Sequence, residues 1–60
     1  MQVGDLRVFK TDVGWFYNSR IFVITHIDSN SSAVTINIID TGFVDHWDRI
    51  SLLHDSKKIK

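Results

Sequence analysis

Two runs rich in β-branched residues, separated by a short polar segment, constrain the fold of this chain more than any other feature. Residues 21–27 read Ile-Phe-Val-Ile-Thr-His-Ile, residues 33–39 read Ala-Val-Thr-Ile-Asn-Ile-Ile, and Asp-Ser-Asn-Ser-Ser lies between them at 28–32. Alternating apolar residues of this type favour strands, and a polar turn of this length joins antiparallel neighbours. The pattern therefore predicts a β-hairpin.

The two strands of this predicted hairpin differ in how clearly the sequence separates a buried face from an exposed face. On its second strand, the side chains that we expect to face the core are Val34, Ile36 and Ile38. On its first strand both faces are apolar, and the main apolar face is expected to carry Ile21, Val23, Thr25 and Ile27. Phe22 and Ile24 would then point away from that face, toward a partner or the other side of a curled sheet, where a β-bulge could bring both faces into use.

The rest of the chain predicts short strands and turns. No segment keeps a 3.6-residue period over about ten positions, so no long helix is expected. In the strand expected over 4–10, Leu6 and Val8 alternate with Asp5, Arg7 and Phe9. The other expected elements are an aromatic loop over 11–20, a turn at 40–42, a strand over 43–47, a turn (at most one 3₁₀ turn) and brief closing strand over 48–53, and a polar, frayed tail over 55–60. Because a small sheet buries one face and limits its free edges by curling, we expect one all-β domain over 1–54, closed as a small five-stranded barrel.

The opening stretch Val3-Gly4-Asp5-Leu6-Arg7-Val8 resembles the start of SH3-like barrels of the KOW and Tudor-like type. The segments 24–28, 40–42 and 48–52 are similar to later parts of the same pattern, which spans residues 3 to 53. The resemblance implies a five-stranded SH3-like barrel, and small proteins of this kind are common among bacteriophage hypothetical proteins. The chain lacks the acidic and tyrosine-rich motifs of peptide-binding SH3 domains and the basic patch of ribosomal KOW domains.

Charge and composition narrow the classes of function. Seven Lys and Arg residues balance seven Asp residues, and the isoelectric point is near 6.8, so the chain lacks the strong positive field of a dedicated nucleic-acid binder. It has no cysteine, which removes thiolate metal sites and disulfides. The N-terminus has no basic segment followed by an apolar run, and no apolar run is long enough to span a bilayer. We expect a cytoplasmic protein that makes no contact with a membrane.

No arrangement of residues predicts catalysis, a metal or a cofactor. Asp40-Thr41-Gly42 resembles the aspartic-protease triplet, but that chemistry needs two facing aspartates, and a β-turn with glycine at positive φ explains the segment better. His26, His46 and His54 do not have the spacing of a metal site, with or without Asp45 and Asp48. We expect a non-catalytic protein with no catalytic residues, metal or cofactor.

The aromatic residues are the strongest functional lead. The candidate binding residues are Trp15, Phe16, Tyr17, Phe43, Asp45 and Trp47. They would form either a shallow aromatic binding face or a plug over the end of a small core. Candidate phosphate contacts are Arg7, Lys10, Arg20 and Arg49. The expected function is a protein-binding module, and the alternatives are a nucleic-acid-binding barrel with stacking aromatics or a symmetric homo-oligomer with a structural or small-molecule-binding role.

Overall fold

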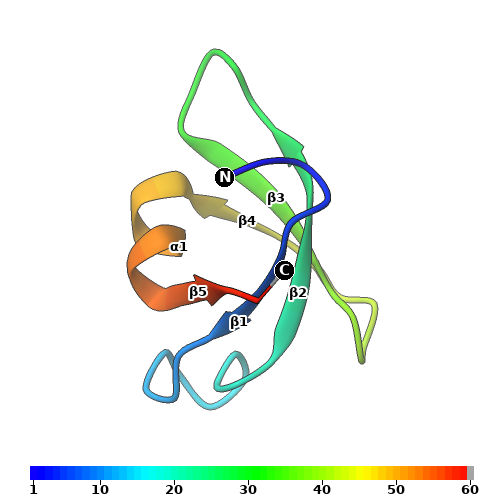
Figure 1. The fold of residues 1–60 in the computed structure, drawn as a ribbon, viewed down its shortest axis with the longest axis vertical. Helices are drawn as coiled ribbons and strands as arrows, with labels where there is room; N and C mark the ends of the chain where they lie inside the picture. Colours follow the sequence, from blue (N-terminus) through cyan, green and yellow to red (C-terminus); the bar gives the residue numbers. More distant parts are fainter. Residues whose placement is uncertain (60) are drawn as a thin grey trace.

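The chain folds into one antiparallel sheet and one short helix, in a computed structural model that describes residues 1–59 (Figure 1). The elements are β1 (Leu6–Phe9), β2 (Ile21–Ile27), β3 (Ala33–Ile38), β4 (Val44–Asp48), α1 (Arg49–Asp55) and β5 (Ser56–Lys58). The five strands are hydrogen-bonded in the order β4-β3-β2-β1-β5, and every neighbouring pair is antiparallel. The predicted mainly-β class with five strands is therefore confirmed.

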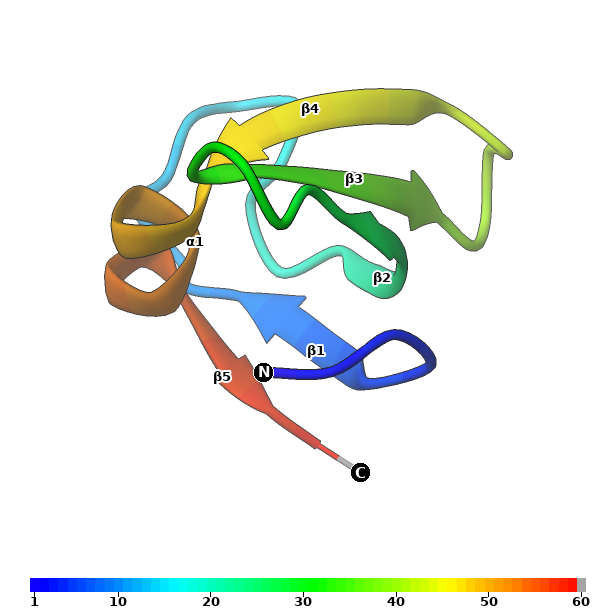
Figure 2. The same cartoon turned by 90° about the horizontal axis from the view of Figure 1, so that it is seen from above.

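The sheet curls strongly but is not closed into a barrel. Seen from above, β3 and β4 lie on one side and β1 and β5 on the other, while α1 sits at the end between β4 and β5 (Figure 2). Within the described part of the chain, β4 and β5 do not pair. The helix connects these two edge strands and contacts both, so it takes the place that strand pairing would have in a closed barrel.

The core lies on the concave side of the curled sheet. Its buried apolar side chains are Phe9, Phe22, Ile24, Val34, Ile36, Ile38 and Leu52. The inward face predicted for β3 is confirmed, but the main apolar face predicted for β2 is wrong, because Phe22 and Ile24 point inward and Ile21 points outward. The register explains the difference, since Phe22 pairs with Ile38 and Ile24 with Ile36, and directly opposed residues share a face. A bulge between Ile24 and His26 shifts the register before the turn.

The region 48–53, predicted as a turn followed by a closing strand, instead begins the helix α1. Asp48 is the N-cap, and its carboxylate accepts hydrogen bonds from the N–H groups of Ile50 (3.1 Å) and Ser51 (3.3 Å). Leu52 is the one helix residue that is fully buried. A helix of seven residues with one core contact leaves too short a periodic pattern to detect in the sequence.

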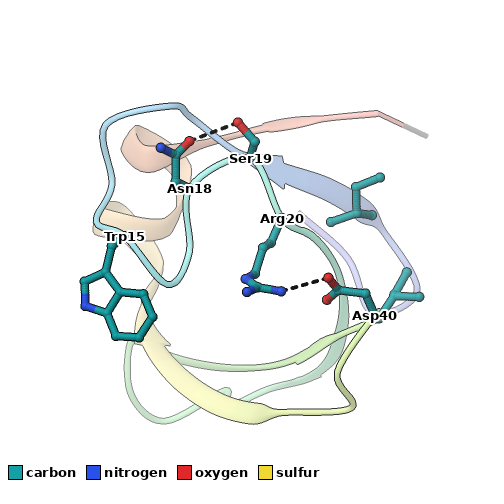
Figure 3. Close-up of a pocket in the computed structure, with 7 residues that line it drawn as sticks. Trp15, Asn18, Ser19, Arg20 and Asp40 are labelled. Atoms are coloured by element: carbon teal, nitrogen blue, oxygen red, sulfur yellow. Dashed lines mark hydrogen bonds and ion pairs between the residues drawn. The ribbon is translucent and has the colours of Figure 1, made fainter.

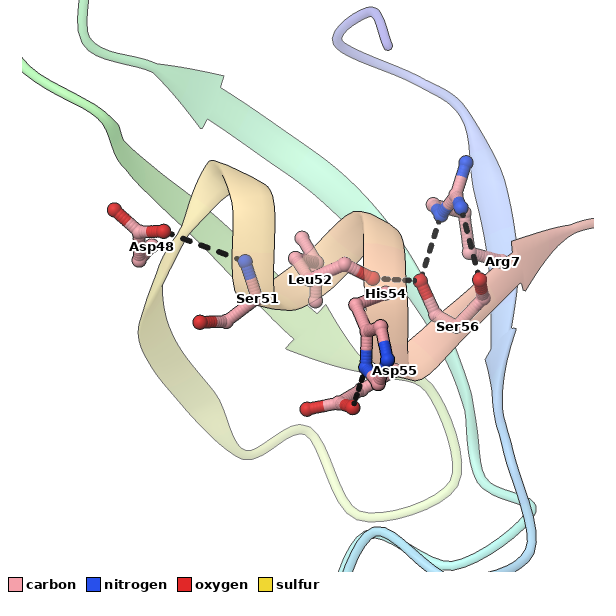
Figure 4. Close-up of polar contacts among 7 residues, drawn as sticks. All are labelled: Arg7, Asp48, Ser51, Leu52, His54, Asp55 and Ser56. Atoms are coloured by element: carbon pink, nitrogen blue, oxygen red, sulfur yellow. Dashed lines mark hydrogen bonds and ion pairs between the residues drawn. The ribbon is translucent and has the colours of Figure 1, made fainter.

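The last strand lies further along the chain than predicted. Residues 56–58, expected in a polar tail, form β5 and pair with β1, while Lys60 lies outside the described residues. Ser56 is buried at this junction, and its hydroxyl donates to the carbonyl oxygen of Leu52 (Figure 4). Arg7 of β1 donates to the Ser56 hydroxyl (2.8 Å) and carbonyl (3.2 Å) oxygens, which fixes β5 against β1.

Candidate docking surface

The aromatic side chains form a continuous series of contacts from the core to the surface. Phe9 in the core packs against Tyr17 and against Trp47, with ring centroids 5.1 Å apart in each pair. Tyr17 contacts Phe16 at 5.1 Å, and Phe16 contacts Trp15 at 5.9 Å. The inner members of the series therefore cover the end of the core, and the exposed fraction of the side chains rises toward Trp15.

A hydrogen bond attaches the 11–20 loop to β4. The hydroxyl of Tyr17 donates to Asp45 Oδ2, and both side chains are half-buried. The carboxylate acceptor, followed by burial and the negative charge of Asp45, raises the pKa of Tyr17 to about 12. Asp45, a predicted binding residue, thus holds the loop in place.

Phe16 and Arg20 fix the outer part of the same loop. The guanidinium of Arg20 stacks 4.8 Å from the Phe16 ring centroid, and its Nε donates to the Phe16 carbonyl oxygen. Its Nη1 also forms an ion pair with Asp40 at 2.7 Å. Phe43 closes the cluster from the β3–β4 turn, 5.2 Å from Phe16. The Arg20 guanidinium is therefore held by Phe16 and Asp40.

Some of the candidate aromatic residues cover the end of the core, and others are exposed as in a binding face. Phe16, Tyr17 and Trp47 are half-buried against the core, as expected of a plug. Trp15 is 90% exposed and Phe43 is also exposed, as expected of a binding face. The predicted aromatic face is thus reduced to its outer members.

An open groove lies beside Trp15. Its lining residues are Trp15, Asn18, Ser19, Arg20, Ile21, Ile39 and Asp40. Trp15 stands on one side, across from the Arg20–Asp40 pair (Figure 3). The volume of about 510 Å³ is in the range of ligand-binding clefts. We call this feature the Trp15 groove.

A row of apolar residues leads away from the groove across the outer face of the sheet. Val8 of β1 pairs with Ile21 of β2. Ile39 lies next to Ile21, since its N–H donates to the Ile21 carbonyl oxygen (3.1 Å). Ile21 is 44% exposed and Ile39 is 55% exposed. The solvent face of an antiparallel sheet is usually polar, so this apolar row is a departure from the usual pattern on the outer face.

Ile21 and Ile39 were not among the site residues expected from the sequence. The available signal was the double isoleucine at 38–39, which breaks the alternation of β3 and places one apolar side chain on each face. Ile21 was assigned to the buried face, so its exposure was not foreseen.

The four candidate phosphate contacts do not form one cationic surface. Arg7 is buried and hydrogen-bonded to Ser56, so its guanidinium is unavailable to a ligand. Arg20 is engaged by Asp40 and Phe16. Lys10 and Arg49 are exposed, with Lys10 at the end of β1 and Arg49 at the start of α1.

Among residues 1–59, no group of three or more His, Cys, Asp or Glu side chains is arranged to hold a metal ion. No helix in the described part of the chain has the length and apolar character needed to cross a membrane. No family model matches the chain, and no curated protein or solved structure is significantly similar to it.

Proposed function

We propose that this chain is a small non-catalytic protein-binding module that docks a segment of a partner protein in the Trp15 groove. The observation that carries the proposal is the 90% exposure of Trp15 beside two exposed isoleucines, Ile21 and Ile39. Tryptophan is enriched among the residues that dominate binding energy, and leaving its indole in water forgoes a large hydrophobic gain. A partner that covers the groove would recover that gain.

The groove is built on a well-anchored loop, which favours affinity. The loop carries its own backbone hydrogen bonds, from Asn18 N to Gly14 O and from Arg20 N to Tyr17 O, both 2.9 Å. Tyr17 adds its bond to Asp45. A preformed surface loses little conformational entropy when a partner binds.

Binding of nucleic acid is the weaker alternative. It would need several free cations near the stacking aromatics, whereas Arg7 is buried and hydrogen-bonded to Ser56, and Arg20 forms a surface ion pair with Asp40. Among the larger aromatic side chains, Trp15 is exposed, while Tyr17 and Trp47 are half-buried against the core. Self-association through the Trp15 groove is a further alternative.

We also propose that the fold is related to SH3-like barrels. A curled sheet in which β1 pairs with both β2 and β5 is compatible with the SH3-like barrels that the N-terminal stretch resembles. A bacteriophage origin is proposed on the same resemblance.

The proposal is tested by selecting a display library of random linear peptides against the full chain. Enriched peptides should bind the wild type and the variant Ile50→Ser equally, because Ile50 is 74% exposed on α1 and does not line the groove. The same peptides should lose at least tenfold in affinity for Trp15→Ala, since a central aromatic contributes roughly 2 kcal/mol or more to such an interface. Peptides that bind Trp15→Ala as tightly as the wild type, or a library without enrichment, would rule the proposal out.

A further inference from the structure

We infer that the docked segment is acidic on one side of its apolar anchor residue and runs in extended form from the Trp15 groove across β2 and β1 to β5. This inference rests on the proposed function and adds the chemistry of the partner. It depends on a second groove, on the two lysines that line this groove, and on the apolar row that connects these lysines to the Trp15 groove.

The second groove adjoins the first. It is lined by Val8, Phe9, Lys10, Thr11, Asp12, Ser19 and Lys57. Ser19 lines both grooves, and its backbone is left-handed (φ 60°). One bound segment can therefore occupy both grooves without leaving the surface.

The two lysines lie on the same outer face. Lys57 pairs with Val8, and Lys10 is two residues beyond Val8, so the two cations are diagonal neighbours across β1 and β5. Both are exposed, and neither takes part in an ion pair within residues 1–59. Asp12 is the one acid that lines this groove. The lining of this groove therefore holds two cations and one carboxylate, while Asp55, whose carbonyl oxygen accepts from the Lys10 N–H (2.8 Å), is a second acid nearby.

The apolar row connects the lysines to the Trp15 groove. Lys57, Val8 and Ile21 are aligned by strand pairing, and Ile39 continues the row on β3. Neighbouring strands are about 4.8 Å apart, so Lys57 lies roughly 10 Å from Ile21 and roughly 14 Å from Ile39. An extended peptide advances about 3.3 Å per residue. Its acidic residues should therefore lie about three or four positions from the anchor.

The charge pattern favours an acidic protein segment over a nucleic acid. Each groove contains one carboxylate, Asp40 in the first and Asp12 in the second. A phosphate backbone carries charge at every step and would be repelled at Asp12, whereas Asp40 is already paired with Arg20. A peptide can present its carboxylates at Lys10 and Lys57 alone and place uncharged residues elsewhere.

The test continues from the peptide selection. Enriched sequences should carry Asp or Glu three or four positions from an apolar anchor. For one synthetic peptide of this set, Lys10→Gln and Lys57→Gln should each weaken binding roughly two- to fivefold and reduce its salt dependence. Arg49→Gln removes one exposed cation elsewhere and should leave the affinity unchanged, and Lys57→Arg should retain most of it.

The outcomes separate this inference from the proposed function. Trp15-dependent peptides without acidic residues would overturn the inference and leave the docking function standing. Peptides whose affinity does not change in Trp15→Ala would overturn both the inference and the docking function. Displacement of the peptide by a single-stranded oligonucleotide would assign the lysines to nucleic acid, and a dimer in sedimentation that Trp15→Ala abolishes would assign the grooves to a second copy of the chain. Either result would overturn the inference.

Discussion

The hydroxyl of Tyr17 donates a hydrogen bond to the carboxylate of Asp45, across 28 positions of sequence. This contact joins the 11–20 loop to β4, while the Tyr17 ring packs edge-on against Trp47 at 5.2 Å. The exposed Trp15 is two residues from Tyr17 in the same loop, so this bond anchors the loop that carries Trp15.

Because Tyr17 is the one tyrosine in the chain, its titration can be followed directly by the absorbance of tyrosinate. We expect a midpoint near pH 12 in the wild type, against an ordinary value of 10.0. The stability that this bond contributes is complete below pH 10 and is lost as the pH rises through about 12, since ionised Tyr17 cannot donate to Asp45. Asp45→Asn should move the midpoint toward 10.0, with circular dichroism confirming that both proteins are folded at each pH. Equal midpoints in the two proteins would contradict the structure.

The inward face of β2 is tested by two matched substitutions. Ile24→Val removes a methylene from the core and should lower the free energy of unfolding by about 0.5–1.5 kcal/mol. Ile21→Val makes the same change on the exposed outer row and should cost less than about 0.5 kcal/mol. Urea unfolding monitored by tryptophan fluorescence measures both. A larger loss of stability for Ile21→Val than for Ile24→Val would support the buried face that was predicted from the sequence.

The hairpin and the inward face of β3 could be predicted because the signal there is local. Val34, Ile36 and Ile38 alternate with polar residues, and a polar turn precedes them. The β2 faces could not be predicted in the same way, because both are apolar. Their orientation is decided by pairing with β3 and by the bulge after Ile24, which are tertiary features.

The candidate site was predicted in part for similar reasons. The aromatic residues do gather at one end of the core, but only packing against Phe9 separates the half-buried Tyr17 from the exposed Trp15. Arg7 was grouped with the surface cations because strand alternation gave no sign of its buried partner. That partner, Ser56, is 49 positions away and lies on a strand that the sequence did not place correctly.

The buried contact between Arg7 and Ser56 gives the next prediction. Ser56→Ala removes the acceptor of Arg7 Nε and leaves that group without its hydrogen-bond partner inside the protein. We expect a loss of about 1–3 kcal/mol in the free energy of unfolding. Ser29→Ala, in the exposed β2–β3 turn, is the matched control and should change stability by less than about 0.5 kcal/mol. A similar small effect at both positions would show that Ser56 does not anchor β5.

The cap of α1 predicts how the fold responds to acid. The hydroxyl of Ser32 donates to the Asp48 carboxylate, and this bond, with those from the Ser51 and Ile50 N–H groups, holds the pKa of Asp48 below its ordinary value of 3.8. A lowered pKa means that the ionised cap stabilises the fold at pH values above 3.8 and that this stability is lost as the pH falls through the folded-state pKa.

Asp48→Asn tests this dependence, because asparagine caps a helix about as well as aspartate but does not titrate in this range. The two proteins should have similar urea midpoints at neutral pH. As the pH falls below 3.8, the urea midpoints of both proteins should decline, because Asp5 and Asp28, whose pKa values are also lowered, titrate in both. The wild-type midpoint should decline more steeply, because only the wild type also loses the ionised Asp48 cap. Parallel curves would mean that the ionised Asp48 carboxylate does not stabilise α1.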